Sequence, residues 1–144
     1  MYYDNPQEEV PQRLERKPPT SAAVVAPQPQ PLNPVWITAV RAAESKKATD
    51  IKVLDLRGVA TFADFFIICT SSNGRQSLAI IDEIEAQLKE EGERPIGVEG
   101  KENAEWVLAD YGDFLVHVFL PKSRAYFDLE RLYRHAKIVP IPEE

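Results

Sequence analysis

The chain has 144 residues, a formal net charge of −6 and 44% hydrophobic residues. That length suits one domain, and the acidic balance does not favour binding nucleic acid through its phosphates, which rewards a basic face. No stretch offers the roughly 20 consecutive apolar residues of a transmembrane helix, and the N-terminus lacks the apolar run of a secretory signal. We therefore expect a protein of the cytoplasm or of an equivalent organellar interior.

Proline divides the chain into two parts. Residues 1–34 hold eight of the 12 prolines, including the stretch APQPQPLNP. Such a segment buries too little apolar surface to offset the entropy of ordering it. We predict a disordered Pro/Gln-rich arm over residues 1–34 and one folded α/β domain over residues 35–144. The single cysteine, Cys69, follows an apolar run and is expected to be a buried thiol.

The sequence of the first half of the domain predicts a helix followed by two strands. Asn33 can cap a helix whose first turn holds Pro34, and apolar residues at a spacing of three to four carry it to about Lys47. The alternation in residues 51–56 predicts a strand. The nearly continuous apolar run over residues 63–71 is typical of a central strand covered on both faces.

The second half predicts a helix, three strands and a closing helix. Ser72 or Asn73 can cap a helix that ends at Gly92, and a short strand follows near residues 96–99. The stretch EWVLADYGDFLVHVF over residues 105–119 reads as two strands joined by a turn. Pro121 ends this hairpin, and YFDLERLYRHA then predicts a helix capped by Asp128. The expected fold is one mixed β-sheet flanked by helices.

The hairpin combines large rings with acids and contains no base. No Lys or Arg occurs between Lys101 and Lys122. Alternation puts Trp106 and Leu108 on one face with Asp110, beside Leu115, His117 and Phe119 of the second strand, and puts Phe114, Val116 and Val118 on the other. Two readings remain open from the residues alone. The first face is either an exposed patch that grips a basic protein, or core covered by helices with acids at the strand ends.

The residues give only weak support to a catalytic function. The strand, loop and helix of FFIICTSSNGRQS resemble a phosphate cradle in outline, but the glycine spacing of known phosphate loops is missing, which favours a simple helix cap. Asp110 and Asp113 could pair on a metal, yet both residue types are common in turns. Cys69 has no marked base beside it. No catalytic residue, metal or cofactor is expected.

Three separated motifs point to a protein family more specifically than the physical properties of their residues do. ADFFIICTSSN, VEGKENAEWVLADYGDFLVHVF and YFDLERLY, in this order and at these spacings, resemble the ribosomal silencing factor family RsfS, also called the Iojap or YbeB family. The resemblance covers about residues 35–137. It implies a sheet domain related to nucleotidyltransferases that is not an enzyme. It also implies a repressor that binds the large ribosomal subunit through its ribosomal protein fourteen, blocks joining of the subunits and lowers translation when nutrients are limiting.

The resemblance also implies a docking surface on or near the hairpin. Asp110 and Asp113 would pair with bases of the partner, while Trp106 and Phe119 would exclude water around those pairs. An acidic binder avoids sticking to ribosomal RNA, so little direct nucleic-acid contact is expected. An aromatic patch can also pair with itself, which makes a homodimer of the free protein a further expectation. The expected partner-binding residues are Trp106, Leu108, Asp110, Tyr111, Gly112, Asp113, His117, Phe119, Tyr126, Phe127, Asp128 and Leu129.

Two positions depart from the family pattern, and one rival reading follows from the fold kinship. Ala109 stands where many relatives carry an aliphatic residue, and Gly74 stands in a loop that often holds a bulkier polar residue. A nucleotidyltransferase would need a Gly-Ser loop and a spaced pair of acids on the next strand, where this chain offers only Glu99. The other rival is an interaction module of a different complex.

Overall fold

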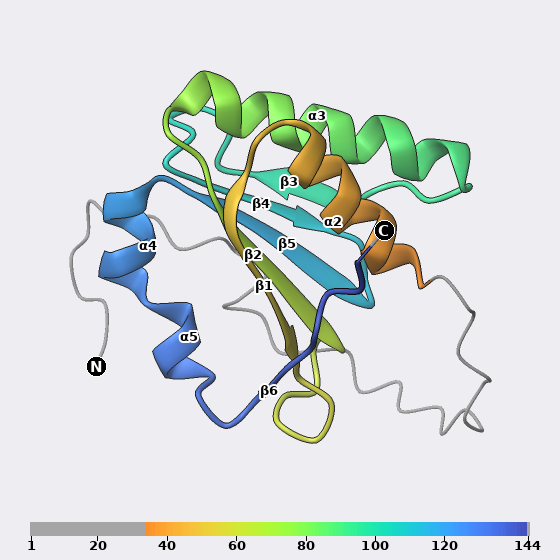
Figure 1. The fold of residues 1–144 in the computed structure, drawn as a ribbon, viewed down its shortest axis with the longest axis vertical. Coiled ribbons are helices and arrows are strands. Elements are labelled where there is room, and N and C mark those ends of the chain that lie inside the picture. The colour runs from red at the N-terminus through yellow and green to blue at the C-terminus, as the bar shows by residue number, and fades with distance from the viewer. Residues whose placement is uncertain (1–33, 144) are drawn as a thin grey trace.

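The computed structural model describes residues 34–143, which form one mixed sheet between two layers of helices (Figure 1). The strand order is β3-β4-β5-β2-β1-β6. Strands β2 and β5 run parallel, and every other neighbouring pair is antiparallel. The strands are β1 (Thr49–Asp55), β2 (Phe65–Thr70), β3 (Gly97–Glu99), β4 (Trp106–Asp110), β5 (Phe114–Phe119) and β6 (Lys137–Ile138).

Two long helices cover one face of the sheet. They are α2 (Val35–Ser45) and α3 (Gly74–Glu90), and they lie side by side above the strands in Figure 1. Each turns an apolar stripe inward, as the spacing predicts. The core beneath them contains Val40 of α2, Ile84 of α3 and Val116 of β5, all fully buried. This face therefore follows directly from the periodicity of the sequence.

Two short helices cover the opposite face. They are α4 (Pro121–Phe127) and α5 (Leu129–Leu132). Phe127 and Leu129 of these helices, together with the segment between β1 and β2, enclose a second apolar core that includes Phe66 and Leu115. The sheet is thus buried on both sides, which explains why all six residues of β5 are buried.

The fold class and the main elements are confirmed. The predicted helices and strands recur within about two residues of their expected ends. The Asn73 side chain accepts a hydrogen bond from the backbone N–H of Gln76 at 2.8 Å and so caps α3. Gly92 follows the helix with a φ of +83°, a conformation that suits glycine. The predicted cap Asn33 and the arm before it lie outside the described residues.

The closing helix differs from its prediction. The chain forms α4 from Pro121, breaks at Asp128 and restarts as α5. Asp128 stands at the N-cap position of α5, as predicted, but it has the left-handed angles φ 48° and ψ 54° and its side chain makes no capping hydrogen bond. A left-handed residue interrupts the helical ladder and turns the chain. This turn lets Phe127 and Leu129 both reach the second core and brings the chain back to β1 as β6, which the sequence did not predict.

Candidate docking surface

The rings of the hairpin are buried rather than exposed. Alternation places them as predicted, because Trp106 pairs with Phe119 and Leu108 pairs with His117 across the two strands on one face. That face lies under α4 and α5, and exposures are 5% for Trp106, 1% for Leu108 and 0% for both His117 and Phe119. The prediction that these four residues form an exposed patch is therefore wrong. The rings that supported self-pairing into a homodimer also lie inside the fold.

Trp106 and His117 form a buried polar contact within this core. The indole Nε1 of Trp106 donates to Nδ1 of His117 at 3.1 Å, so the imidazole proton lies on Nε2. That Nε2 atom is buried and has no hydrogen-bond partner among the described residues. Burial lowers the pKa of His117 to about 3, which keeps the ring neutral. The Trp106 ring also packs on Phe127, with ring centroids 4.5 Å apart.

The turn residues have different accessibility. Asp110 is only 5% exposed, and its carboxylate accepts a hydrogen bond from the backbone N–H of Gly112 at 2.8 Å. Gly112 itself has a φ of +87°, which favours glycine. Asp110 thus shapes the turn, and its predicted role as an exposed charge is wrong. Asp113 is exposed, whereas Tyr111 is buried and stacks on Phe114 at a centroid distance of 5.1 Å.

An accessible hollow lies at the other end of the hairpin. Tyr126 is 50% exposed, while its neighbour Phe127 is buried and meets it edge to face at 5.0 Å. The hollow has a volume of about 340 Å³ and adjoins the start of β4 and the first turns of α4. We call it the α4 hollow; its lining residues are Glu105, Leu120, Lys122, Ser123, Tyr126 and Phe127. Of the other predicted residues nearby, Asp128 is half-buried and Leu129 is buried.

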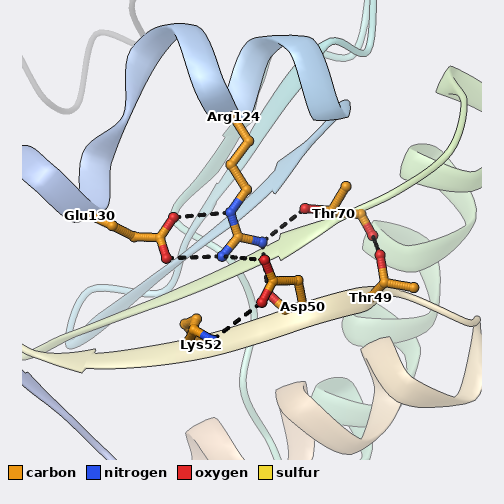
Figure 2. Close-up of polar contacts among 6 residues, drawn as sticks. All are labelled: Thr49, Asp50, Lys52, Thr70, Arg124 and Glu130. Carbon is orange, nitrogen blue, oxygen red and sulfur yellow. Dashed lines mark hydrogen bonds and ion pairs between the residues drawn. The ribbon is translucent and has the colours of Figure 1, made fainter.

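A buried arginine holds the two short helices in place (Figure 2). Arg124 of α4 is 8% exposed, and its Nε and one Nη each donate to the Glu130 carboxylate of α5 at 3.1 Å. The other Nη donates to the Asp50 carbonyl of β1 at 2.6 Å and to the Thr70 hydroxyl of β2 at 2.8 Å. This side chain therefore ties α4 to α5 and to the sheet. Sequence reasoning missed it, because an arginine among polar residues gives no sign of burial.

The described residues do not form the geometry that the catalytic hypotheses require. Burial raises the pKa of the Cys69 thiol to about 12, so it carries no thiolate at neutral pH. Within residues 34–143 no group of three His, Cys, Asp or Glu side chains could hold a metal ion. At the start of α3 the hydroxyls of Ser71 and Ser77 share a short hydrogen bond inside the fold. These polar groups serve the helix start and do not line a cradle.

The two departures from the family pattern have structural roles. Ala109 is 1% exposed and lies in the core under α2 and α3, so it faces inward. Gly74 begins α3 close to Ala104, where an added Cβ atom would stand 3.2 Å from the Ala104 Cβ. A bulkier residue would need this neighbour to move.

No helix in the described part of the chain is long and apolar enough to cross a membrane.

The chain is similar in sequence to ribosomal silencing factors. Residues 29–144 match the family described as "Ribosomal silencing factor during starvation". The ribosomal silencing factor RsfS of Halalkalibacterium halodurans is 41% identical over 103 residues, which cover 72% of this chain and 88% of that protein. The mouse protein named "Mitochondrial assembly of ribosomal large subunit protein 1" is 26% identical over 91 residues, covering 61% of this chain and 40% of that protein.

A solved structure agrees with the sequence relatives. The crystal structure of a Chromobacterium violaceum protein superposes with a TM-score of 0.68 at 38% identity, and the match covers 69% of this chain and 83% of that one. The sequence match and the structural match therefore agree over most of the described domain. The chain belongs to the ribosomal silencing factor family.

Proposed function

We propose that this protein binds the large ribosomal subunit through its ribosomal protein fourteen, blocks joining of the small subunit and so lowers translation under nutrient limitation. The observation that carries the proposal is membership of the silencing factor family over nearly the whole domain. The mouse relative, whose name refers to assembly of the large subunit, favours the same subunit. The proposed place of action follows from the partner and is the cytoplasm. The proposed role is binding, without catalysis.

The α4 hollow is the proposed centre of the docking surface. Its lining includes the half-exposed Tyr126 and the buried Phe127. Hot spots of protein interfaces are enriched in aromatic side chains that pack into pockets. The exposed Glu105 borders it, and Glu102 lies three residues earlier on the chain, also exposed. These acids suit a basic partner, and ribosomal proteins are basic. Trp106 contributes from below by packing on Phe127.

The exposed Asp113 is a second proposed contact at the far end of β4. Strand β4 has five residues, so roughly 13 Å separates the Cα atoms of its two end residues at about 3.3 Å per residue. An interface of ordinary size can include both ends. Variants at each end therefore distinguish a surface centred on the hollow from one centred on the turn.

The test is the affinity of surface variants for isolated large subunits. Tyr126→Ala should weaken binding by about 2 kcal/mol, or roughly 30-fold, as expected for a hot spot. Asp113→Lys should weaken it less, because a rim charge contributes little. Ile138→Ala is the matched control, since Ile138 is 65% exposed and lies in β6, at the sheet edge opposite β3 and β4.

The outcomes separate the location from the function. Unchanged affinity of Tyr126→Ala together with a large loss in Asp113→Lys would move the docking surface to the turn. No binding of the wild-type protein to large subunits would refute the proposed function itself. Thermal unfolding of each variant verifies that the fold is intact.

A further inference from the structure

The charge of this acidic protein is distributed unevenly. Residues 82–113, which run from α3 to the hairpin turn, hold eleven acids against three bases, a formal charge of −8. Residues 121–138, which form α4, α5 and β6, hold five bases against two acids, a formal charge of +3. The net charge therefore conceals a basic end, and binding to a polyanion depends on the local face rather than on the total.

Three bases of this end are exposed and form no ion pair within residues 34–143. Arg131 lies in the last turn of α5, Arg134 follows this helix, and Lys137 lies in β6; all three residues are exposed. Among the described residues the structure records no salt bridge for any of them, although the domain has more acids than bases. We call these three residues the basic edge.

Two acids beside these bases have ion-pair partners of their own. Asp55 lies opposite Lys137 in the sheet, but it forms an ion pair with Arg57 at 2.8 Å, and its hydrogen bond with Arg57 is the main cause of the lowered pKa of Asp55. Glu130 is held by Arg124 through two hydrogen bonds. Lys137 also helps to lower the pKa of Asp55, but neither acid forms an ion pair with the basic edge, so these bases can still bind a ligand outside the fold.

The basic edge stands on rigid structure. Tyr133 packs edge to face on Phe66 at 5.0 Å and on Phe62 at 6.3 Å, which fixes the turn between α5 and β6 on the second core. The backbone N–H of Arg134 donates to the carbonyl of Arg131 at 3.2 Å, and β6 pairs with β1. Figure 1 shows α5 and β6 as consecutive parts of the same side of the molecule. A base on an anchored turn loses little conformational entropy on binding compared with one on a free tail.

We infer that the basic edge contacts the phosphate backbone of ribosomal RNA when the protein is docked on the large subunit. This inference rests on the proposed function, which supplies the RNA-bearing partner. The α4 hollow and the basic edge share the α4–α5 segment, so one approach can seat the hollow on a ribosomal protein and the edge on neighbouring RNA. The acidic residues of α3 and the hairpin turn would repel RNA and so fix the orientation.

The test compares how salt affects binding to large subunits. The variant is Arg131→Gln/Arg134→Gln, and the matched control is Lys89→Gln/Arg94→Gln, which removes two exposed bases from the acidic part of the chain. Each lost phosphate contact reduces the slope of log affinity against log salt by about 0.7 to 0.9. Between 50 and 200 mM salt, the wild type and the control should therefore lose roughly tenfold more affinity than the variant.

A second arm separates RNA from protein as the ligand. Hydroxyl-radical footprinting of the ribosomal RNA on the complex should show a protected segment with wild type that is lost with the variant. Binding of both proteins to isolated ribosomal protein fourteen should be the same. An equal loss of affinity for that isolated protein would overturn the RNA assignment, and so would a salt slope that matches the control. Failure of the wild-type protein to bind large subunits would instead refute the proposed function, and the inference with it.

Discussion

Replacement of Arg124 by methionine should destabilise the fold through one identifiable set of contacts. Methionine keeps an apolar stem in the site but removes the guanidinium. Four hydrogen bonds are lost: two to the Glu130 carboxylate at 3.1 Å, one to the Asp50 carbonyl at 2.6 Å and one to the Thr70 hydroxyl at 2.8 Å. These bonds join α4 to α5, β1 and β2, so their loss should be felt by the whole second layer.

The magnitude follows from burial. Breaking a fully buried ion pair by removing one partner costs about 3–5 kcal/mol, because the other charge is left without compensation. Arg124 also forms an ion pair with the Asp50 carboxylate at 3.6 Å. The Glu130 side chain is 35% exposed and that of Asp50 is 58% exposed, so water can solvate both carboxylates when the guanidinium is removed. We therefore expect the free energy of unfolding to fall by about 2–3 kcal/mol.

Urea denaturation followed by tryptophan fluorescence measures this change. Lys122→Met is the control, since Lys122 lies on the same helix but is exposed, and it should alter stability by less than about 0.5 kcal/mol. In a double-mutant cycle, Glu130→Gln should cost much less in the Arg124→Met background than in the wild type. If Arg124→Met were as stable as the control, the proposed anchoring of α4 and α5 would be refuted.

Three further predictions concern the buried hairpin and its neighbour strand. Trp106→Ala should lower the free energy of unfolding by about 3–5 kcal/mol, so any loss of ribosome binding in this variant must be read beside its thermal melt. His117 has a pKa near 3 in the fold against 6.5 in the unfolded chain. The unfolded state therefore takes up the proton first, and stability should fall by up to about 1.4 kcal/mol per unit as pH drops from 6.5 toward 3; a His117→Phe variant with the same pH slope would contradict this. Cys69, with a thiol pKa near 12 and no exposed surface, should react with a thiol reagent only at the rate of unfolding, and prompt labelling of the native protein would disagree.

The layer of long helices was predictable from sequence because its signals are local. The apolar spacing of α2 and α3 and the Asn73 cap are contained within single turns of chain. The continuous apolar run of β2 likewise indicated a strand buried on both faces, and it lies between β5 and β1 in the middle of the sheet. Alternation also assigned the hairpin residues to their correct faces.

The second layer was not predictable in the same way. Whether the Trp106 face meets solvent or helices depends on where α4 and α5 pack, which no local pattern states. The break at Asp128 needs a left-handed backbone that the helical spacing of the segment conceals. Net charge is also an average, because it combines the acidic α3 and hairpin with the basic edge. The predicted site residues thus divide into buried residues, such as Trp106, and exposed residues, such as Tyr126.

The central claim is that this protein occupies the large subunit in place of the small one. Sedimentation of the purified protein with large subunits, small subunits and whole ribosomes tests it most directly. The account predicts co-sedimentation with large subunits alone, and a lower yield of whole ribosomes when small subunits are added afterwards. Association with small subunits, or undiminished joining in the presence of bound protein, would contradict it.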